Sequence, residues 1–299
     1  MNFSNLYKFI KNMSKDYGVP CYDISIHCNY NNVFYTKHSY ADLKNRIKTF
    51  GKNLYFMHPS AKIMCCVALM RLVEDGKTSL NASVKDYLPN FEKDASIKEM
   101  IYEYSKRYDY NEKAFNFYNM SKLIEEVSGQ AFYEYMNDLI IKPLKMKSTS
   151  FTLNDKNKKH ISLQYNFDKK TKRFTKTGVS VEELFDIYKG CLITTANDFS
   201  KFCNVICAGG TTKNGYNLIS SESINTLINE TLYKETEKEN VFVCLGYNGD
   251  LVLIDSDRKV TIVYAQHVKN IPIEQLKMYP KMRELVYEGI DSVSYNLFP

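Results

Sequence analysis

Residues 239–266, ENVFVCLGYNGDLVLIDSDRKVTIVYAQ, decide the fold of this chain. They contain three strand-like runs separated by the turn sequences YNGD and DSDRK, a pattern typical of consecutive antiparallel strands. Near the other end of the chain, YDISIHC (22–28) and VFYTKHSY (33–40) alternate in period two around NYNN, which predicts a hairpin. We therefore expect one antiparallel sheet that is built from both ends of the chain.

The middle of the chain predicts helices. From about residue 60 to 145 the apolar residues follow helical spacing, and SAKIMCCVALMRLVEDG (60–76) ends in a glycine, a common helix end. Amphipathic helices are also expected at the N-terminus and at about 274–289. The fold class is therefore α+β. An antiparallel sheet lobe (1–52 and 232–299) with flanking helices carries an inserted, mostly helical lobe (53–231), and the two are best treated as one domain, 1–299.

Composition narrows the function classes. A chain of 299 residues that is 44% hydrophobic can bury the core of such a domain. Its net charge of +6 comes from scattered lysines, so we expect no nucleic-acid partner. No apolar run approaches the ~20 residues of a membrane span, and lysines interrupt the N-terminal apolar residues, so we expect a cytoplasmic protein with reduced cysteines. No group of His, Cys and acidic residues has the spacing of metal ligands, so the sequence predicts neither a metal nor a cofactor.

Four longer stretches carry a resemblance to a known family. They are LVEDGKTSLNASVKDYLPNF (72–91), SIKEMIYEYS (96–105), LIEEVSGQAFYEYMNDLIIKPLKMKSTSF (123–151) and GCLITTANDFSKFCNVICAGG (190–210). In this order they resemble segments of the serine β-lactamase and penicillin-binding-protein superfamily, in its class C-like branch. The resemblance implies a β-lactamase-like fold and a cleft with three motifs: S-x-x-K with the nucleophilic serine, Y-x-N, and K/H-x-G on an edge strand.

The first motif lacks its nucleophile. Counting from Lys62 to Gly76 gives the family's spacing, so Lys62 occupies the position of the motif lysine and Pro59 that of the serine. Proline suits the first turn of a helix, but it has no hydroxyl group that could form an acyl-enzyme. Ser60 is adjacent, yet one residue along a helix rotates a side chain by roughly 100°, away from the position that would face Lys62.

The other two motifs are also altered. In the second, Glu112 falls on the tyrosine position, where a carboxylate would pair with Lys62 and favour its charged form, the opposite of what a general base requires. An alignment shifted by two residues places Tyr110 there instead. In the third motif Cys244 replaces the lysine or histidine, and Gly246 is retained. Strand alternation puts both on one face, which in the family looks into the cleft, and we expect Cys244 to be buried and inert.

Three altered motifs favour a catalytically inactive member of the superfamily that acts by binding a small molecule or a protein partner. The alternative is a serine or cysteine hydrolase (an esterase, amidase or peptidase) that uses Ser60 or Cys244 in a rebuilt active site. A third hypothesis is a structural or self-assembling protein, because one fold hosts many functions. The vestigial pocket is expected to contain Pro59, Ser60, Lys62, Glu112, Cys244 and Gly246.

Overall fold

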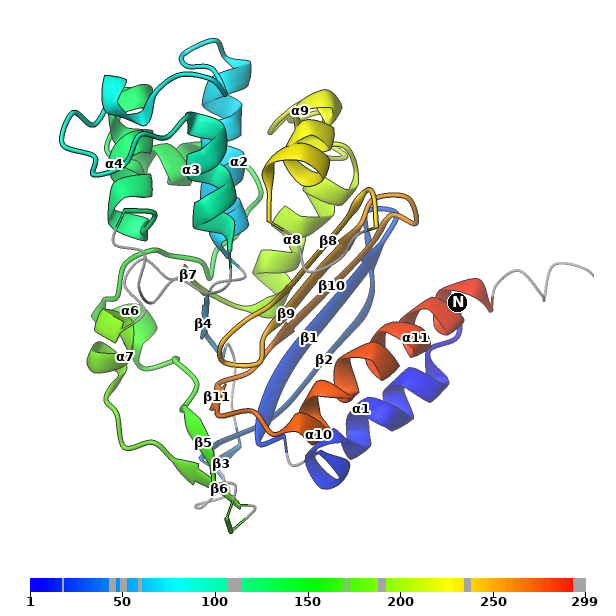
Figure 1. Cartoon of the computed structure of the whole chain (residues 1–299). Helices are drawn as coiled ribbons and strands as arrows, with labels where there is room; N and C mark the ends of the chain where they lie inside the picture. The colour runs from blue at the N-terminus through cyan, green and yellow to red at the C-terminus, as the bar shows by residue number, and fades with distance from the viewer. Residues whose placement is uncertain are drawn as a thin grey trace, which may run out of the picture.

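The computed structural model describes residues 1–17, 19–42, 47–48, 53–58, 61–106, 114–168, 170–171, 173–187, 192–233 and 238–292. Within these ranges the main element is a six-stranded sheet in the order β3-β2-β1-β10-β9-β8, in which every neighbouring pair is antiparallel. Its strands are β1 (Cys21–Cys28), β2 (Asn31–Asp42), β3 (Ile47–Lys48), β8 (Val241–Leu245), β9 (Leu251–Asp255) and β10 (Val260–Ala265). Helices lie on both faces of this sheet (Figure 1), so the α+β class is confirmed.

The pairing of β1 with β10 joins the two ends of the chain. Ile24 lies opposite Tyr264, and Ser25 lies opposite Val263. β1 also forms a hairpin with β2, while β8, β9 and β10 follow one another as an antiparallel meander. Figure 1 shows the blue N-terminal strands beside the orange C-terminal strands. The sheet is thus built from both ends of the chain, as the alternation predicts.

One face of the sheet is covered by α1 (Ser4–Asp16) and α11 (Met278–Asp291), which lie side by side (Figure 1). Apolar residues of both helices pack on Ile24, Ile26 and other residues of this face. The single closing helix expected at about 274–289 is divided into α10 (Ile273–Leu276) and α11. The physical reason is Pro280, which lacks an N–H and is tolerated only in the first turn of a helix, so a new helix begins just before it.

The other face of the sheet is covered by α8 (Ala196–Cys207) and, beyond it, by the helical lobe (Figure 1). A single apolar cluster connects this face with α8 and with the helices α2 (Lys62–Glu74), α3 (Ile97–Ser105), α4 (Phe117–Ser128) and α9 (Ser221–Thr226). α2 ends before Gly76, whose φ of 70° is the left-handed conformation that suits glycine at a helix end. The helices therefore form an insertion that packs on one face of the sheet.

Smaller elements complete the described structure. β4 (Tyr55–Met57) pairs with β7 (Leu192–Thr194), and β5 (Tyr165–Asp168) pairs with both β6 (Arg173–Lys176) and β11 (Val268–Lys269). The short helices are α5 (Phe132–Met136), α6 (Asp155–Lys158) and α7 (Val181–Ile187), with a 3₁₀ turn at Val84–Asp86 and π turns at Asn137–Ile141 and Leu227–Thr231. None of the helices in the described ranges has both the length and the hydrophobicity that crossing a bilayer requires.

A capping box starts α3, the helix that carries Tyr104 into the candidate site. The Ser96 hydroxyl accepts a hydrogen bond from the Glu99 N–H (3.2 Å), and the Glu99 carboxylate accepts one from the Ser96 N–H (2.8 Å). Because Ser96→Ala removes the acceptor for the Glu99 N–H, we expect it to lower the free energy of unfolding by about 1 kcal/mol in urea denaturation. Ser121→Ala is the matched control, because its hydroxyl bonds only within α4, and we expect it to cost less than about 0.5 kcal/mol. Equal losses in the two variants would contradict the capping role.

Candidate functional site

Lys62 lies at the start of a buried helix. α2 begins at Lys62, and nearly all of its residues are buried in the helical lobe. The lysine itself is 9% exposed. Its Nζ donates a hydrogen bond to the carbonyl oxygen of Lys106 (3.1 Å) and lies 4.9 Å from the centre of the Tyr104 ring, two contacts that suit an ammonium group. Pro59 and Ser60 lie outside the described residues.

The end of α3 forms the wall beside Lys62. Tyr104 and Ser105 occupy its last turn. The Ser105 hydroxyl donates to the carbonyl oxygen of Tyr102 (2.8 Å) and accepts from the N–H of Tyr233 (2.8 Å). The second bond ties α3 to the segment that precedes β8. Glu112 lies outside the described residues, and its pairing with Lys62 stays a prediction.

Cys244 lies on the face of β8 that strand alternation predicts. Phe242 and Cys244 belong to the apolar cluster that contains the α2 side chains, whereas Val243 and Leu245 pack with the cluster beneath α1 and α11. Cys244 is 7% exposed. A reagent in solution therefore has little access to this thiol.

Gly246 begins a tight turn that carries a buried carboxylate. The Gly246 N–H donates to the carbonyl oxygen of Asp250 (2.6 Å), and the Tyr247 N–H donates to the carbonyl oxygen of His58 (3.1 Å). A Cβ atom at Gly246 would lie 1.9 Å from Oδ1 of Asp250, a fully buried residue, so only glycine fits beside this carboxyl group. The turn therefore places a retained motif glycine next to the residue that precedes Pro59.

His267 anchors the strand that leads into α2. Its Nε2 accepts a hydrogen bond from the Phe56 N–H (2.7 Å), so Nδ1 carries the proton and donates to the carbonyl oxygen of Ser162 (2.9 Å). Burial lowers the pKa of His267 to about 4. Burial, together with the positive charge of Lys62, lowers the pKa of His58 to about 3. Both imidazoles are thus neutral at physiological pH, and neither is a strong base.

The described cysteines are all buried. Seven cysteines are described, and all are free, buried thiols; Cys191 lies outside the described residues. Burial raises the pKa of Cys65 to about 12 and that of Cys66 well above its usual value. Among the residues with described positions, no three His, Cys, Asp or Glu side chains come together as a possible metal site.

The structure brings together part of the predicted pocket. Lys62 begins α2, and the turn at Gly246 contacts the segment that enters this helix. The sequence did not predict three residues of this region: Tyr104, which contacts Lys62; Asp250, which contacts Gly246; and His267, which holds Phe56. The YNGD sequence identified Asp250 only as a turn residue, and no local pattern predicts that its carboxyl group is buried.

Comparisons with known proteins identify the family of this chain. The family model described as Beta-lactamase matches residues 105–262, just over half of the chain. A teichoic acid D-alanine hydrolase of Staphylococcus aureus is 24% identical over 277 aligned residues, which cover 78% of this chain and 66% of that protein. The chain thus spans slightly less than two thirds of the length of this relative.

Solved structures share the fold. Simvastatin synthase from Aspergillus terreus has a TM-score of 0.76 at 10% identity, covering 95% of this chain and 94% of that chain. EstCE1, a hydrolase with promiscuous acyltransferase activity, has a TM-score of 0.74 at 12% identity, covering 95% of this chain and 99% of that chain. At these identities the likeness shows the fold alone.

Because of His267, we expect the free energy of unfolding to decrease as the pH is lowered. An unfolded histidine binds a proton below about pH 6.5, whereas folded His267 stays neutral until about pH 4, so its contribution is complete above pH 6.5 and is lost as the pH falls. Between about pH 8 and pH 5 this loss amounts to about 2 kcal/mol. Urea denaturation of His267→Asn should show a correspondingly smaller fall than the wild type, whereas exposed His160→Gln should keep the full fall. The same fall in His267→Asn as in the wild type would rule out this linkage.

Burial predicts that Cys244 reacts slowly. Iodoacetamide should alkylate Cys244 at least about tenfold more slowly in the native protein than in concentrated urea, because its thiol is shielded by apolar side chains. Peptide mass spectrometry measures the labelling at each cysteine, and Cys65 in the same cluster is the internal control. Rapid native labelling of Cys244 ahead of Cys65, with loss of a measured esterase activity, would instead identify a cysteine hydrolase.

Proposed function

Because the chain belongs to the Beta-lactamase family, we propose that it retains the family's cleft as a binding site and has lost the acyl-transfer reaction. The occupant would be a small molecule or a segment of a protein partner. Relatives with this fold include a teichoic acid D-alanine hydrolase and a hydrolase with acyltransferase activity, so a compact acyl ester or amide is the ligand class to test first.

The observation that carries this proposal is the start of α2. The helix begins at Lys62, and the residue three positions earlier, where the serine of the S-x-x-K motif would stand, is Pro59. Covalent catalysis by this family needs a hydroxyl group beside the lysine, since the oxygen attacks the acyl carbon and the neighbouring base removes its proton. A proline ring supplies no such oxygen.

The surroundings of Lys62 support binding more than proton transfer. Its Nζ donates to the Lys106 carbonyl oxygen and faces the Tyr104 ring. The nearby His58 imidazole has a pKa of about 3, too low for an effective base at neutral pH. Cys244, the residue at the third motif, is buried among apolar side chains. The ammonium group of a buried lysine can still attract the carboxylate or carbonyl group of a ligand.

The alternative function is hydrolysis by a rebuilt site. It is favoured by the hydrolase activity of the relatives and by the presence of Ser60 next to Pro59. In this case Ser60 or Cys244 would form the acyl-enzyme.

The cytoplasmic location and the absence of a nucleic-acid partner also remain predictions, which cell fractionation and nucleic-acid binding assays can test.

Covalent labelling separates the two functions. We expect neither a fluorescent penicillin nor a fluorophosphonate to form an adduct with the wild-type protein, as read by intact-mass spectrometry. Pro59→Ser should not restore labelling by the penicillin at a rate typical of the family, because catalytic groups that act as a unit are not rescued singly. A rapid stoichiometric adduct on the wild type would overturn the proposal, and peptide mapping would show whether Ser60 or Cys244 carries it.

Reversible binding is measured in parallel. The same penicillin, used as a ligand, should raise the melting temperature of the wild type, because it stabilises the folded state by mass action. Lys62→Met keeps the length of the side chain but removes its charge, and we expect it to weaken binding about tenfold. Unchanged binding by this variant would show that the cleft at Lys62 is not the site.

A further inference from the structure

A cavity that shares no residue with the predicted pocket at Lys62 lies against the middle of α8. It has a volume of about 250 Å³. Its lining comes from α8, from the end of β1 and the turn that follows it, and from the segments 143–145 and 212–216. In the sheet order β10 and β9 separate β1 from β8, the strand that carries Cys244. The cavity is therefore a separate candidate site.

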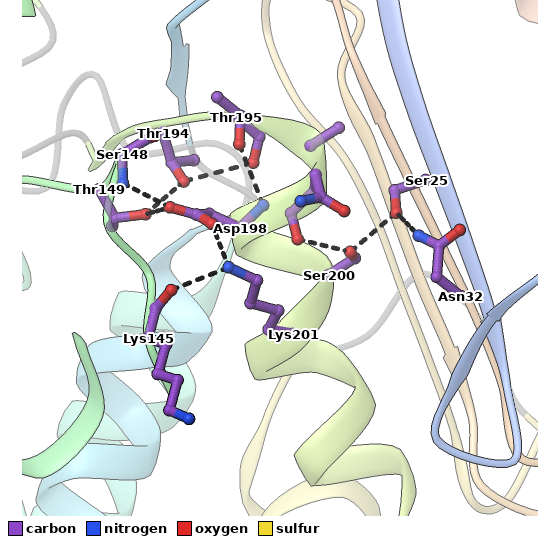
Figure 2. A network of polar contacts seen from close by, with 12 residues as sticks. Ser25, Asn32, Lys145, Ser148, Thr149, Thr194, Thr195, Asp198, Ser200 and Lys201 are labelled. Carbon is purple, nitrogen blue, oxygen red and sulfur yellow. Dashed lines mark hydrogen bonds and ion pairs between the residues drawn. The ribbon is translucent and has the colours of Figure 1, made fainter. Parts of the chain in front are cut away.

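The cationic groups of this cavity are not all neutralised by the protein. Lys201 pairs with the carboxylate of Asp198 (2.5 Å). Lys213 donates to the side-chain oxygen of Asn31 (2.7 Å), which carries no charge. Lys145 contributes its carbonyl oxygen to Lys201 (2.8 Å), and Figure 2 shows its side chain extending away from that ion pair. Among the described residues no carboxylate forms an ion pair with Lys145 or Lys213, so two positive charges remain.

The rest of the lining supplies no negative charge. None of the described residues that line the cavity is an aspartate or a glutamate. His27 is neutral at physiological pH, because burial and the positive charge of Lys201 lower its pKa to about 4. The hydroxyl groups of Tyr30 and Tyr216 already donate to backbone carbonyl oxygens, at 3.1 Å and 2.7 Å respectively. The cavity therefore offers its lysines to an anion.

A buried amide group completes the polar part of the lining. Asn204 lies on α8 and is only 8% exposed. Its Nδ2 donates no hydrogen bond to another residue in the described part of the chain. The amide has two N–H donors, and leaving such a buried group unpaired costs free energy that an acceptor on a ligand would recover. Asn204 and the two lysines thus present donors from three different segments of the chain.

The remaining lining is apolar. Leu144 and Val205 are buried, and Pro143 and the rings of Tyr30 and Tyr216 also line the cavity. An inorganic anion would leave this apolar surface in contact with water, whereas a ligand with an apolar body would cover it. Ligand sites commonly combine apolar walls with a few polar groups and have volumes of ≈300–1,000 Å³. A cavity just below that range suits a small ligand.

We propose that this cavity binds a small carboxylic acid in its ionised form, with an apolar body such as a phenyl ring. The carboxylate oxygens accept hydrogen bonds from Lys145, Lys213 and Asn204, and the ring packs on the apolar lining. An ionised carboxylate has only acceptors, with about four lone-pair sites, enough for these three donor groups. This site is independent of the cleft at Lys62 and of the function proposed for it, so either proposal can fail without the other.

Isothermal titration calorimetry at constant ionic strength tests the ligand class with four probes: benzoate, benzamide, acetate and inorganic phosphate. We expect benzoate to bind at least about tenfold more tightly than each of the others, because benzamide lacks the charge, and acetate and phosphate lack the apolar body. Benzamide binding as tightly as benzoate would overturn the role of the lysines. Acetate or phosphate binding as tightly as benzoate would overturn the role of the apolar lining. Absence of benzoate binding would overturn the site.

A matched pair of lysine variants locates the binding. Lys213→Met keeps the length of the side chain but removes its charge, and we expect it to weaken benzoate binding about tenfold. Lys8→Met makes the same change of net charge on α1, which covers the other face of the sheet (Figure 1), and should leave benzoate binding unchanged. Equal effects of the two variants would show that benzoate binds elsewhere.

Asn204→Leu tests the buried donor separately from charge. It removes the two N–H donors from a side chain of similar size, so we expect benzoate binding to weaken about tenfold. Circular dichroism and the melting temperature check that each variant is folded, and the lysine pair tests the location whether or not Asn204→Leu folds. Wild-type affinity for benzoate in folded Asn204→Leu would overturn the role of this amide.

Discussion

The antiparallel pairing of β1 with β10 is the interaction on which the rest of the structure depends. It brings Asp23 opposite Ala265 and Cys28 opposite Val260, so segments from the two ends of the chain become one sheet. Closing so long a loop costs conformational entropy, which the burial of apolar side chains on both faces offsets. Alternation along β1 then decides on which face of the sheet each side chain lies. Ile24 faces α1 and α11, whereas its neighbours Asp23 and Ser25 face α8.

The same sheet positions the segment that leads into α2. His267, which follows β10, holds Phe56 in β4, and the turn after β8 holds the carbonyl oxygen of His58 through the Tyr247 N–H. β4 and His58 lead directly to α2, so the C-terminal strands determine where Lys62 lies. This framework does not depend on a nucleophile. A chain could therefore lose the reactive hydroxyl and keep the position of Lys62, which is the physical basis of the binding function that we propose.

Buried polar groups lie on the face of β1 that packs against α8. Ser25 hydrogen-bonds with Ser200 of α8 and with Asn32 of β2, so its hydroxyl is satisfied within the protein (Figure 2). Asp23, two residues earlier, lies at the start of α8, where its Oδ2 accepts a hydrogen bond from the Ala196 N–H. Burial raises the pKa of Asp23 to about 6, a consequence of placing a carboxyl group in this position.

The sequence by itself determined the elements that depend on local chemistry. Alternation predicted the strands and the face of Cys244, glycine predicted the end of α2 before Gly76, and motif spacing put Lys62 near a helix start. Only the tertiary structure decided what lies opposite each side chain. The burial of Asp250 against Gly246, the bond from Phe56 to His267 and the cavity beside His27 join residues that are close in space through the sheet. Periodicity shows which way a side chain points, but the group that it meets depends on long-range pairing, which local sequence does not encode.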